Sequence, residues 1–183
     1  MTKKTIQNNR PMIQPNINNY KESFKGKILI LNPDTGVFVQ LDEWKKESDP
    51  TRAEVVAIDT PYYRIAIRKK FVGESLTFKR AQKAAAEAEI LGQKCRCPRR
   101  NECTYIYDAR FNGLDEALEL IGGDPIKGLI WTCDEDADPE FARRYGAGIA
   151  WFFNGTNGGL YYFSVFYAFR CQAVTLFPTE RSE

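Results

Sequence analysis

The stretch from Phe152 to Phe169 constrains the fold most, because it carries two aromatic-rich runs around the dipeptide Asn157-Gly158. Asn-Gly between two strand-like runs is the strongest short-range signal for a β-hairpin with a two-residue type I′ turn. Such a turn places Thr156 opposite Gly159 and Phe153 opposite Tyr162. Because side chains alternate between the faces of a strand, both faces carry large aromatic groups. One face is expected to hold Trp151, Phe153, Leu160 and Tyr162, and the other Phe152, Asn154, Tyr161 and Phe163.

Aromatic side chains on both faces leave two interpretations open. One face packs on the core, and the other is either covered by a neighbouring segment or exposed as an apolar patch, which is typical of a binding site. The residues Val165, Phe166 and Tyr167 break the strand alternation, which predicts a loop that continues the patch. Tyr and Phe suit recognition because they offer a large contact area with few rotatable bonds. The candidate ligand-binding residues are Phe152, Phe153, Asn154, Thr156, Tyr161, Tyr162, Phe163, Val165, Phe166 and Tyr167, with Trp131 expected below them.

Size and charge limit the kinds of partner. A chain of 183 residues, 43% of them hydrophobic, can form one compact domain with a short appendage. Its 26 Lys and Arg residues nearly balance its 24 Asp and Glu residues, so no strong field recruits nucleic acid or an anionic membrane. No apolar run approaches the roughly 20 residues that span a bilayer. The basic start lacks the apolar region of a signal peptide, so we expect a cytoplasmic location unless export needs no cleaved signal.

Histidine is absent from the sequence, and its absence removes much of enzyme chemistry. No Ser-His or Cys-His nucleophile, no imidazole base and no histidine-containing metal site can be built. The five cysteines are an odd number, and a domain of this size folds without disulfides, so we expect reduced and mostly buried thiols. The sequence therefore predicts a protein that is not an enzyme and needs no cofactor and no metal.

Three regions follow one another along the chain. Residues 1–25 are rich in Asn, Gln and Lys without a clear period, which indicates an extended arm. Residues 26–75 predict an N-terminal β segment with strands at 27–31, 37–41, 54–58 and 63–69. Residues 76–178 predict the main domain. Its helices are expected within 75–92, capped by Ser75 or Thr77 and stopped by Gly92, and at 102–107 and 114–121; its strands are expected at 130–133, 149–156, 159–164 and 168–177. This order favours an α+β fold with mixed or antiparallel sheets and two or three helices.

Several short motifs in residues 76–178 resemble one family. The segment 95-CRCPRRNE-102 resembles the Trp-Arg-Leu-Pro-Thr-x-x-Glu motif of bacterial and phage domains of the C-type lectin fold related to formylglycine-generating enzyme, with Arg96, Pro98 and Glu102 in matching positions. The segment 130-IWTCDED-136 is similar to the family's Tyr-Trp-Ser-Ser-Thr-Glu strand, and 167-YAFRCQAV-174 to its closing Tyr-x-x-Arg-x-Arg-x-Val. Cys95, Cys97 and Gln172 depart from the pattern. The resemblance implies a C-type lectin fold.

The closing hairpin of this family is also where the variable proteins of diversity-generating retroelements carry their mutable positions. Adenines are randomised there, so an Asn codon AAY can become any NNY codon. Nearly every residue from Phe152 to Ala168 is of a type that such codons encode. The resemblance thus implies a rigid scaffold that displays a changeable ligand-binding face on a phage tail tip or a cell surface.

Four other kinds of site are alternatives. Cys95, Cys97, Cys103 and Cys133 could form a zinc site, although C-x-C-x₅-C is not the usual spacing. The run 134-DEDADPE-140 alternates acidic residues as a calcium loop does, but Pro139 and Tyr145 occupy the Gly and Glu positions of an EF-hand. Copper chemistry, as in the oxidase relatives, would need Cys133 to pair with Cys171. Arg96, Arg99 and Arg100 are interpreted as a solvated or ion-paired surface rather than a nucleic-acid site.

Two classes of function remain. The first is a binding module whose aromatic surface recognises a protein or glycan receptor on another cell or virion. The second is a structural or assembly subunit, in which the same aromatics form a fixed interface and the N-terminal arm holds a homo-oligomer together.

Overall fold

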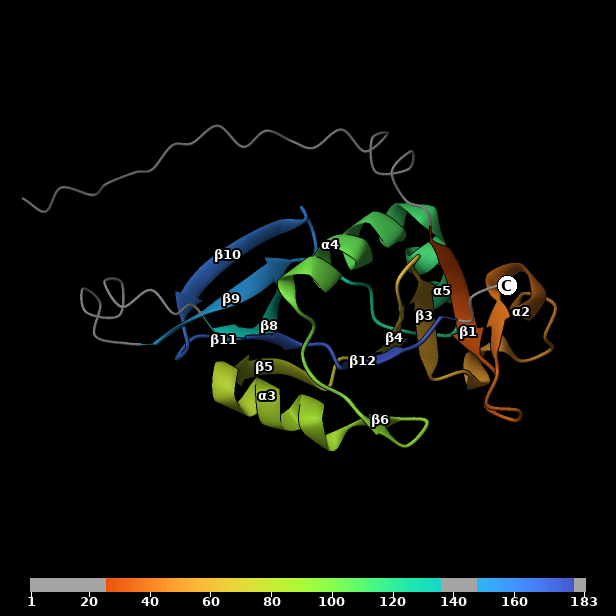
Figure 1. Cartoon of the computed structure of the whole chain (residues 1–183), viewed down its shortest axis with the longest axis horizontal. Coiled ribbons are helices and arrows are strands. Elements are labelled where there is room, and N and C mark those ends of the chain that lie inside the picture. The colour runs from red at the N-terminus through yellow and green to blue at the C-terminus, as the bar shows by residue number, and fades with distance from the viewer. Residues whose placement is uncertain (1–25, 136–147, 180–183) are drawn as a thin grey trace, which may run out of the picture.

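The computed structural model describes residues 26–135 and 148–179. Two five-stranded sheets with helices packed against them make up this part of the chain, which confirms the α+β class (Figure 1). The predicted arm over residues 1–25 lies outside the described residues, as does most of the acidic run considered for calcium.

The first sheet has the strand order β12-β4-β3-β1-β2 and is antiparallel throughout. Its apolar runs are nearly continuous because both of its faces are covered. Ile28, Ile30 and Val56 pack in one core cluster with the helices α4 (Arg100–Ala109) and α5 (Asp115–Leu120), whereas Leu29 and Val55 pack in a second cluster with helix α3 (Phe78–Glu87). The strands are β1 (Lys27–Leu31), β2 (Phe38–Gln40), β3 (Val55–Asp59), β4 (Arg64–Arg68) and β12 (Val174–Phe177).

The second sheet has the order β10-β9-β8-β11-β5, so β10 and β5 are its edges. The pair β8 and β11 is parallel and the other pairs are antiparallel, which makes the sheet mixed. Its strands are β5 (Gly73–Thr77), β8 (Leu129–Glu135), β9 (Ile149–Asn154), β10 (Gly159–Ser164) and β11 (Ala168–Cys171).

The sheets are held together by the last part of the chain. The sequence predicts one strand over 168–177, but the structure divides it: β11 belongs to the second sheet and β12 to the first. Gln172, between them, is buried, and its amide donates to the carbonyl of Arg68 at 2.7 Å. The first sheet thus consists of four strands from residues 26–75 and, at one edge, β12 from the C-terminal end of the chain. Its side chains pack in the same core clusters as those of the second sheet and the helices.

The helices follow the predicted order with different bounds. The predicted helix within 75–92 is only α3 (Phe78–Glu87), because Gly73–Thr77 pair with β11 as strand β5. Gly92 does not stop this helix; Leu91 and Gly92, both with positive φ, turn a short hairpin of β6 (Glu89–Ile90) and β7 (Gln93–Lys94). The others are α2 (Leu41–Trp44), the 3₁₀ turn η1 (Pro50–Arg52), α4 (Arg100–Ala109), the π turn η2 (Arg110–Leu114) and α5 (Asp115–Leu120).

The aromatic hairpin is present, but its predicted two-residue turn is wrong. The structure pairs Gly159 with Asn154 and Tyr162 with Trp151, which leaves a loop over residues 155–158. Within the loop over residues 155–158, only Gly158 has a positive φ, whereas a type I′ turn needs two such residues. The register differs from the prediction by an even number of residues, so each side chain keeps the face assigned to it.

Contacts with the preceding loop explain the longer turn. The N–H of Gly155 donates to the carbonyl of Gly128 at 2.8 Å, and a Cβ on Gly155 would lie 2.6 Å from the carbonyl oxygen of Ile126. A Cβ on Gly158 would lie 2.7 Å from the ring of Tyr107 on α4. Tertiary packing therefore favours the longer loop over residues 155–158. This loop forms because Gly155 and Gly158 have no Cβ that would clash with their neighbours.

Candidate functional site

The aromatic residues of the hairpin divide sharply between core and surface. On β9, Phe152 and Phe153 are 8% and 1% exposed and pack in the two core clusters. These two candidate residues therefore support the surface rather than form it. On β10 and the loop after it, five aromatic side chains are 40–75% exposed, and we call them the aromatic patch. The patch comprises Tyr161, Tyr162, Phe163, Phe166 and Tyr167.

A stack of rings supports the patch from below. Tyr161 lies over Phe152, with ring centroids 5.5 Å apart and an interplanar angle of 25°. Phe152 contacts Phe169 at 4.7 Å, and Phe169 contacts Trp131 at 4.5 Å. Trp131 is fully buried, and its indole N–H donates to the carbonyl of Leu76 at 2.7 Å. The exposed ring of Tyr161 thus rests on a column of aromatic rings. Trp131 lies at the base of this column, below the patch, as the sequence predicted.

Tyr162 lies on the opposite face of β10 and has its own support. Its ring meets Trp151 edge to face at 5.3 Å. The guanidinium of Arg100 lies 4.6 Å from the centroid of the Trp151 ring. The backbone N–H of Arg100 donates to the carboxylate of Asp134 at 2.8 Å. Arg100, one of the three clustered arginines, is therefore engaged within the protein.

Asn154, Thr156 and Val165 have local roles. The side-chain oxygen of Asn154 accepts from the N–H of Thr156 at 2.9 Å, and the hydroxyl oxygen of Thr156 accepts from the N–H of Gly128 at 3.1 Å. Both side chains build the hairpin loop. The backbone N–H of Val165 donates to Gly148 at 3.1 Å, and Tyr167 closes a turn on Ser164 at 3.1 Å, which confirms the predicted loop after β10.

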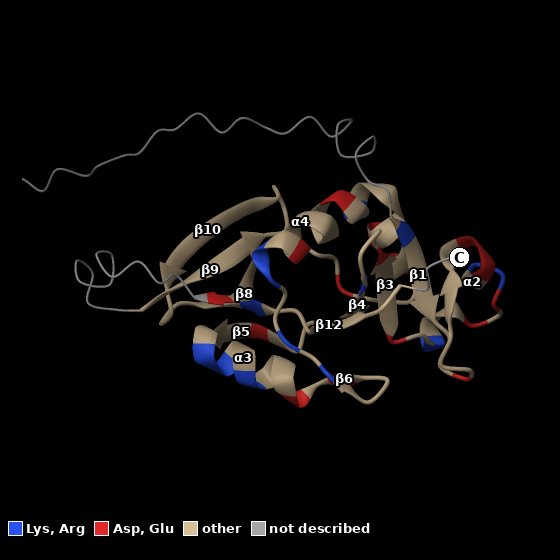
Figure 2. Ribbon diagram, in the orientation of Figure 1, with Lys and Arg blue, Asp and Glu red and all other residues tan. Residues whose placement is uncertain are grey.

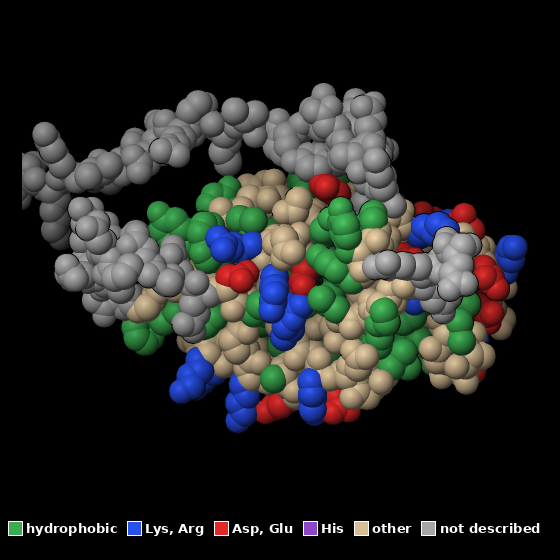
Figure 3. Space-filling view, viewed as in Figure 1, with side chains coloured by type: hydrophobic (Ala, Val, Ile, Leu, Met, Phe, Trp, Pro, Cys, Tyr) green, Lys and Arg blue, Asp and Glu red, His purple; other side chains and the backbone are tan. Residues whose placement is uncertain are grey.

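The hairpin region carries no charge. No Asp, Glu, Lys or Arg occurs from Gly148 to Phe169, although 27% of the chain is charged. Strands β9 and β10 are tan in Figure 2, whereas several residues of α3 are coloured blue as Lys or Arg. In Figure 3 hydrophobic side chains gather at the end of the molecule where β9 and β10 lie. This charge-free run is a second signal in the sequence for the same surface.

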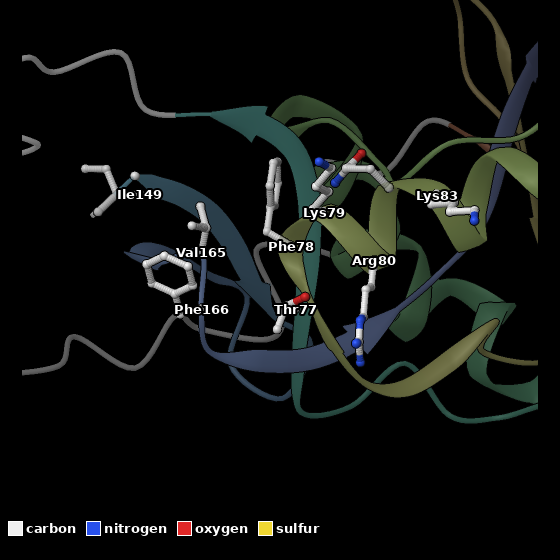
Figure 4. Close-up of a pocket in the computed structure, with 10 residues that line it drawn as sticks. Thr77, Phe78, Lys79, Arg80, Lys83, Ile149, Val165 and Phe166 are labelled. Carbon is white, nitrogen blue, oxygen red and sulfur yellow. The ribbon is translucent and has the colours of Figure 1, made fainter. Parts of the chain in front are cut away.

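A pocket of about 890 Å³ lies beside the patch (Figure 4). Ile149, Val165 and Phe166 face the start of α3 across it, where Phe78 contributes a further apolar wall. Lysine and arginine side chains of α3 border it. Such a pocket suits an apolar group. Sequence reasoning missed it, because it joins segments far apart in the chain. Its lining is Thr77, Phe78, Lys79, Arg80, Gln82, Lys83, Gly148, Ile149, Val165 and Phe166.

Two residues of the motif 95-CRCPRRNE-102, Arg96 and Glu102, form a structural ion pair. The two terminal guanidinium nitrogens of Arg96, Nη1 and Nη2, donate to the Glu102 carboxylate at 2.7 and 2.6 Å. Glu102 is 1% exposed and also accepts from the N–H of Arg99 at 2.8 Å, at the start of α4. The hydrogen bonds that Arg96 donates to Glu102 raise the pKa of Arg96. The carbonyl of Pro98 accepts from the N–H of Cys133 on β8 at 3.0 Å, so the motif joins α4 to the second sheet.

The cysteines are unpaired thiols, and all but Cys133 are buried. The four cysteines considered for zinc do not converge: in residues 26–135 and 148–179, no three His, Cys, Asp or Glu side chains gather as metal ligands. The copper alternative would pair Cys171 with Cys133; the structure places the sulfur of Cys171 3.5 Å from that of Cys97. The contact with Cys171 and burial raise the pKa of Cys97, and burial raises that of Cys103 well above its ordinary value.

No protein-family model matches this chain, and no curated protein matches it. Within the described residues, no helix has the length and apolar character needed to cross a membrane. The function proposed below is therefore inferred from the geometry of the patch and from the motifs of the sequence.

Proposed function

We propose that this protein is a non-enzymatic binding protein that recognises a protein or glycan receptor on another cell or virion through the aromatic patch. One observation carries the proposal: five aromatic side chains, 40–75% exposed, lie in a region without a single charged residue. Monomeric proteins rarely expose contiguous apolar area without a use for it.

The support beneath the patch suits recognition. Binding loses free energy when mobile side chains become ordered, and rigid rings reduce that loss. Tyr161 is held over Phe152, and Phe163 contacts Tyr167 edge to face at 4.4 Å. The tyrosine hydroxyls add hydrogen-bonding groups to an apolar surface, a combination that serves both protein and glycan ligands.

The scaffold in this proposal is a C-type lectin fold. Its support is the α+β arrangement together with the roles of the motif residues. Arg96 pairs with the buried Glu102, Trp131 lies at the base of the aromatic column, and the hairpin that the family varies is the hairpin that carries the patch. A phage tail tip or a cell surface is the location that this scaffold favours.

Diversification by a retroelement is the second part of the proposal. Exposed positions such as Tyr161, Phe163 and Tyr167 can change with little effect on the core, whereas Phe153 cannot. The nucleotide sequence around the gene tests this part directly. We expect a near-copy of the segment that encodes residues 150–174, differing where the copy has adenines, beside a reverse transcriptase gene. Without such a copy, the patch is a fixed surface.

A fixed assembly interface is the alternative function, and the position of β10 at a sheet edge favours it. A variant with Tyr161→Ser, Phe163→Ser and Tyr167→Ser separates the two. A displayed receptor site loses its ligand while the chain stays folded and monodisperse, whereas an assembly interface loses its oligomer.

Binding of the wild type and this triple variant to a glycan array and a panel of whole bacterial cells tests the proposal. Tyr62→Ser is the matched control, because Tyr62 is 75% exposed and lies outside the patch. We expect each ligand of the wild type to bind the control and not the triple variant. A ligand that binds the triple variant and the wild type equally strongly would show that the receptor site lies elsewhere.

A further inference from the structure

Strand β10 is an unprotected sheet edge. It is 6 residues long and has a strand neighbour on one side only within the described ranges. Native proteins protect edges with charges, short strands, bulges or covering segments. Strand β10 carries no charged residue and no proline, its register with β9 is regular, and no strand in residues 26–135 or 148–179 pairs with its outer side. In Figure 1 it forms the outer margin of the second sheet.

The other edges of the two five-stranded sheets are protected in the ways that β10 is not. Strand β2 has only 3 residues and leads directly into α2. At β12, the backbone of Val174 exchanges hydrogen bonds with Arg96, both at 2.9 Å, so a covering segment lies there. Strand β5 carries Glu74, which pairs with Arg170 at 2.9 Å, and its register with β11 is irregular. The contrast singles out β10 as the edge open to another strand.

The exposed rings on β10 lie on both of its faces. Tyr161 and Phe163, 40% and 44% exposed, are on one face, and Tyr162, 44% exposed, is on the other. A partner that lies flat on the sheet contacts one face only. A strand added at the edge brings side chains next to both faces at once, because its own side chains alternate. The distribution of exposed rings therefore fits strand addition.

A second copy of this chain is the occupant that the composition favours. When a strand pairs antiparallel with its own copy, the residue at the two-fold axis lies opposite itself and its neighbours lie close to their own copies, so a charge near the axis would meet a like charge. The uncharged run from Gly148 to Phe169 has no such repulsion. The two-fold axis is normal to the sheet. If the pairing is centred on Tyr162, the two copies of Tyr162 lie directly opposite each other. If it is centred on Tyr161, they lie diagonally across the strand pair.

We propose that this protein forms a two-fold dimer by antiparallel pairing of β10 with β10 of a second copy, which joins the two mixed sheets into one. The faces that carry Tyr161 and Phe163 then lie on the same side of the joined sheet. The dimer presents two patches side by side, and a receptor with repeated epitopes gains avidity from both. The dimer itself does not depend on the proposed receptor binding.

Light scattering after size-exclusion chromatography tests the dimer. We expect wild type at twice the chain mass of 21.0 kDa, and both Tyr162→Lys and Tyr162→Asp at the single-chain mass, because like charges meet at the axis. An equimolar mixture of the two variants should recover the doubled mass, which also shows that both are folded. Tyr62→Lys, on an exposed ring far from β10 in the sequence, should stay dimeric.

Three results would overturn the dimer: wild type with the mass of one chain at every concentration, single variants that dimerise like wild type, or a mixture that stays at the single-chain mass. Tyr162 belongs to the aromatic patch, so receptor binding is tested with the wild type, the control Tyr62→Ser and the triple variant, and not with the Tyr162 variants. The mass of the wild type is measured without a receptor. A single-chain mass with intact receptor binding removes the dimer alone, and a doubled mass without patch-dependent binding removes the receptor site alone.

Discussion

Removal of the Glu102 carboxylate should destabilise this fold more than a surface substitution can. Glu102 has a side-chain exposure of 2% and forms a bidentate pair with Arg96, whose side chain is 30% exposed. Loss of one partner of a buried pair leaves the other charge poorly solvated and destabilises by about 3–5 kcal/mol. Because Arg96 retains some contact with water, we assign about 2–4 kcal/mol to this loss in Glu102→Leu.

The same substitution also removes a helix cap. The N–H of Arg99 donates to Glu102 at 2.8 Å at the start of α4, and loss of such a cap costs about 1 kcal/mol. We expect Glu102→Leu to lower the free energy of unfolding by about 3–5 kcal/mol in total. Glu102→Gln keeps an acceptor for this N–H and should lose about 2 kcal/mol.

Urea unfolding followed by tryptophan fluorescence measures these losses, because Trp44 and Trp131 are 1% and 0% exposed and report on the core. Adding Arg96→Met to Glu102→Leu is the diagnostic step. An apolar pair leaves no unpaired charge, so the double variant should recover at least half of the lost stability. A loss below about 1 kcal/mol for Glu102→Leu, or a double variant as unstable as the sum of the single ones, would refute the reasoning.

Three further predictions concern the loop, a partly buried acid and the thiols. Gly158→Ala should destabilise more than Gly122→Ala, as seen in urea midpoints: both glycines have positive φ, but only at Gly158 does a Cβ meet a ring, at 2.7 Å. Burial raises the pKa of Asp108, so its ionised form is disfavoured in the folded state. Asp108→Asn should therefore raise the melting temperature at neutral pH, and this gain should disappear below the ordinary carboxyl pKa of about 3.9. Iodoacetamide should label the native protein only at Cys133, and all five cysteines after unfolding, as checked by mass spectrometry.

The hairpin strands could be predicted from the sequence because alternation and aromatic content are local properties. Their faces were assigned correctly, and Trp131 was expected beneath them. The turn could not be predicted, because the contacts of Gly155 with Ile126 and Gly128 join residues that are distant in the chain. Local propensity at Asn157-Gly158 was outweighed by these tertiary contacts.

Other differences have the same cause. Thr77 is the N-cap residue of α3, as predicted, although its side chain makes no capping hydrogen bond. Ser75, the other predicted cap, lies inside strand β5, which pairs with β11. The run 168–177 reads as one strand because each half is apolar, and only its neighbours show that the halves belong to different sheets. The exposure of β10 was one of two open interpretations, since alternation cannot tell an edge strand from a central one.

The aromatic patch is exposed and contributes little to the stability of the fold. Thermal unfolding of the triple variant Tyr161→Ser, Phe163→Ser, Tyr167→Ser tests this most directly. The reference is Phe153→Ala, which removes one ring that is 1% exposed and should cost about 3–5 kcal/mol. We expect the triple variant to unfold cooperatively at a higher temperature than Phe153→Ala. A triple variant that melts below Phe153→Ala would show that the patch is packed as core, and the binding surface proposed here would not exist.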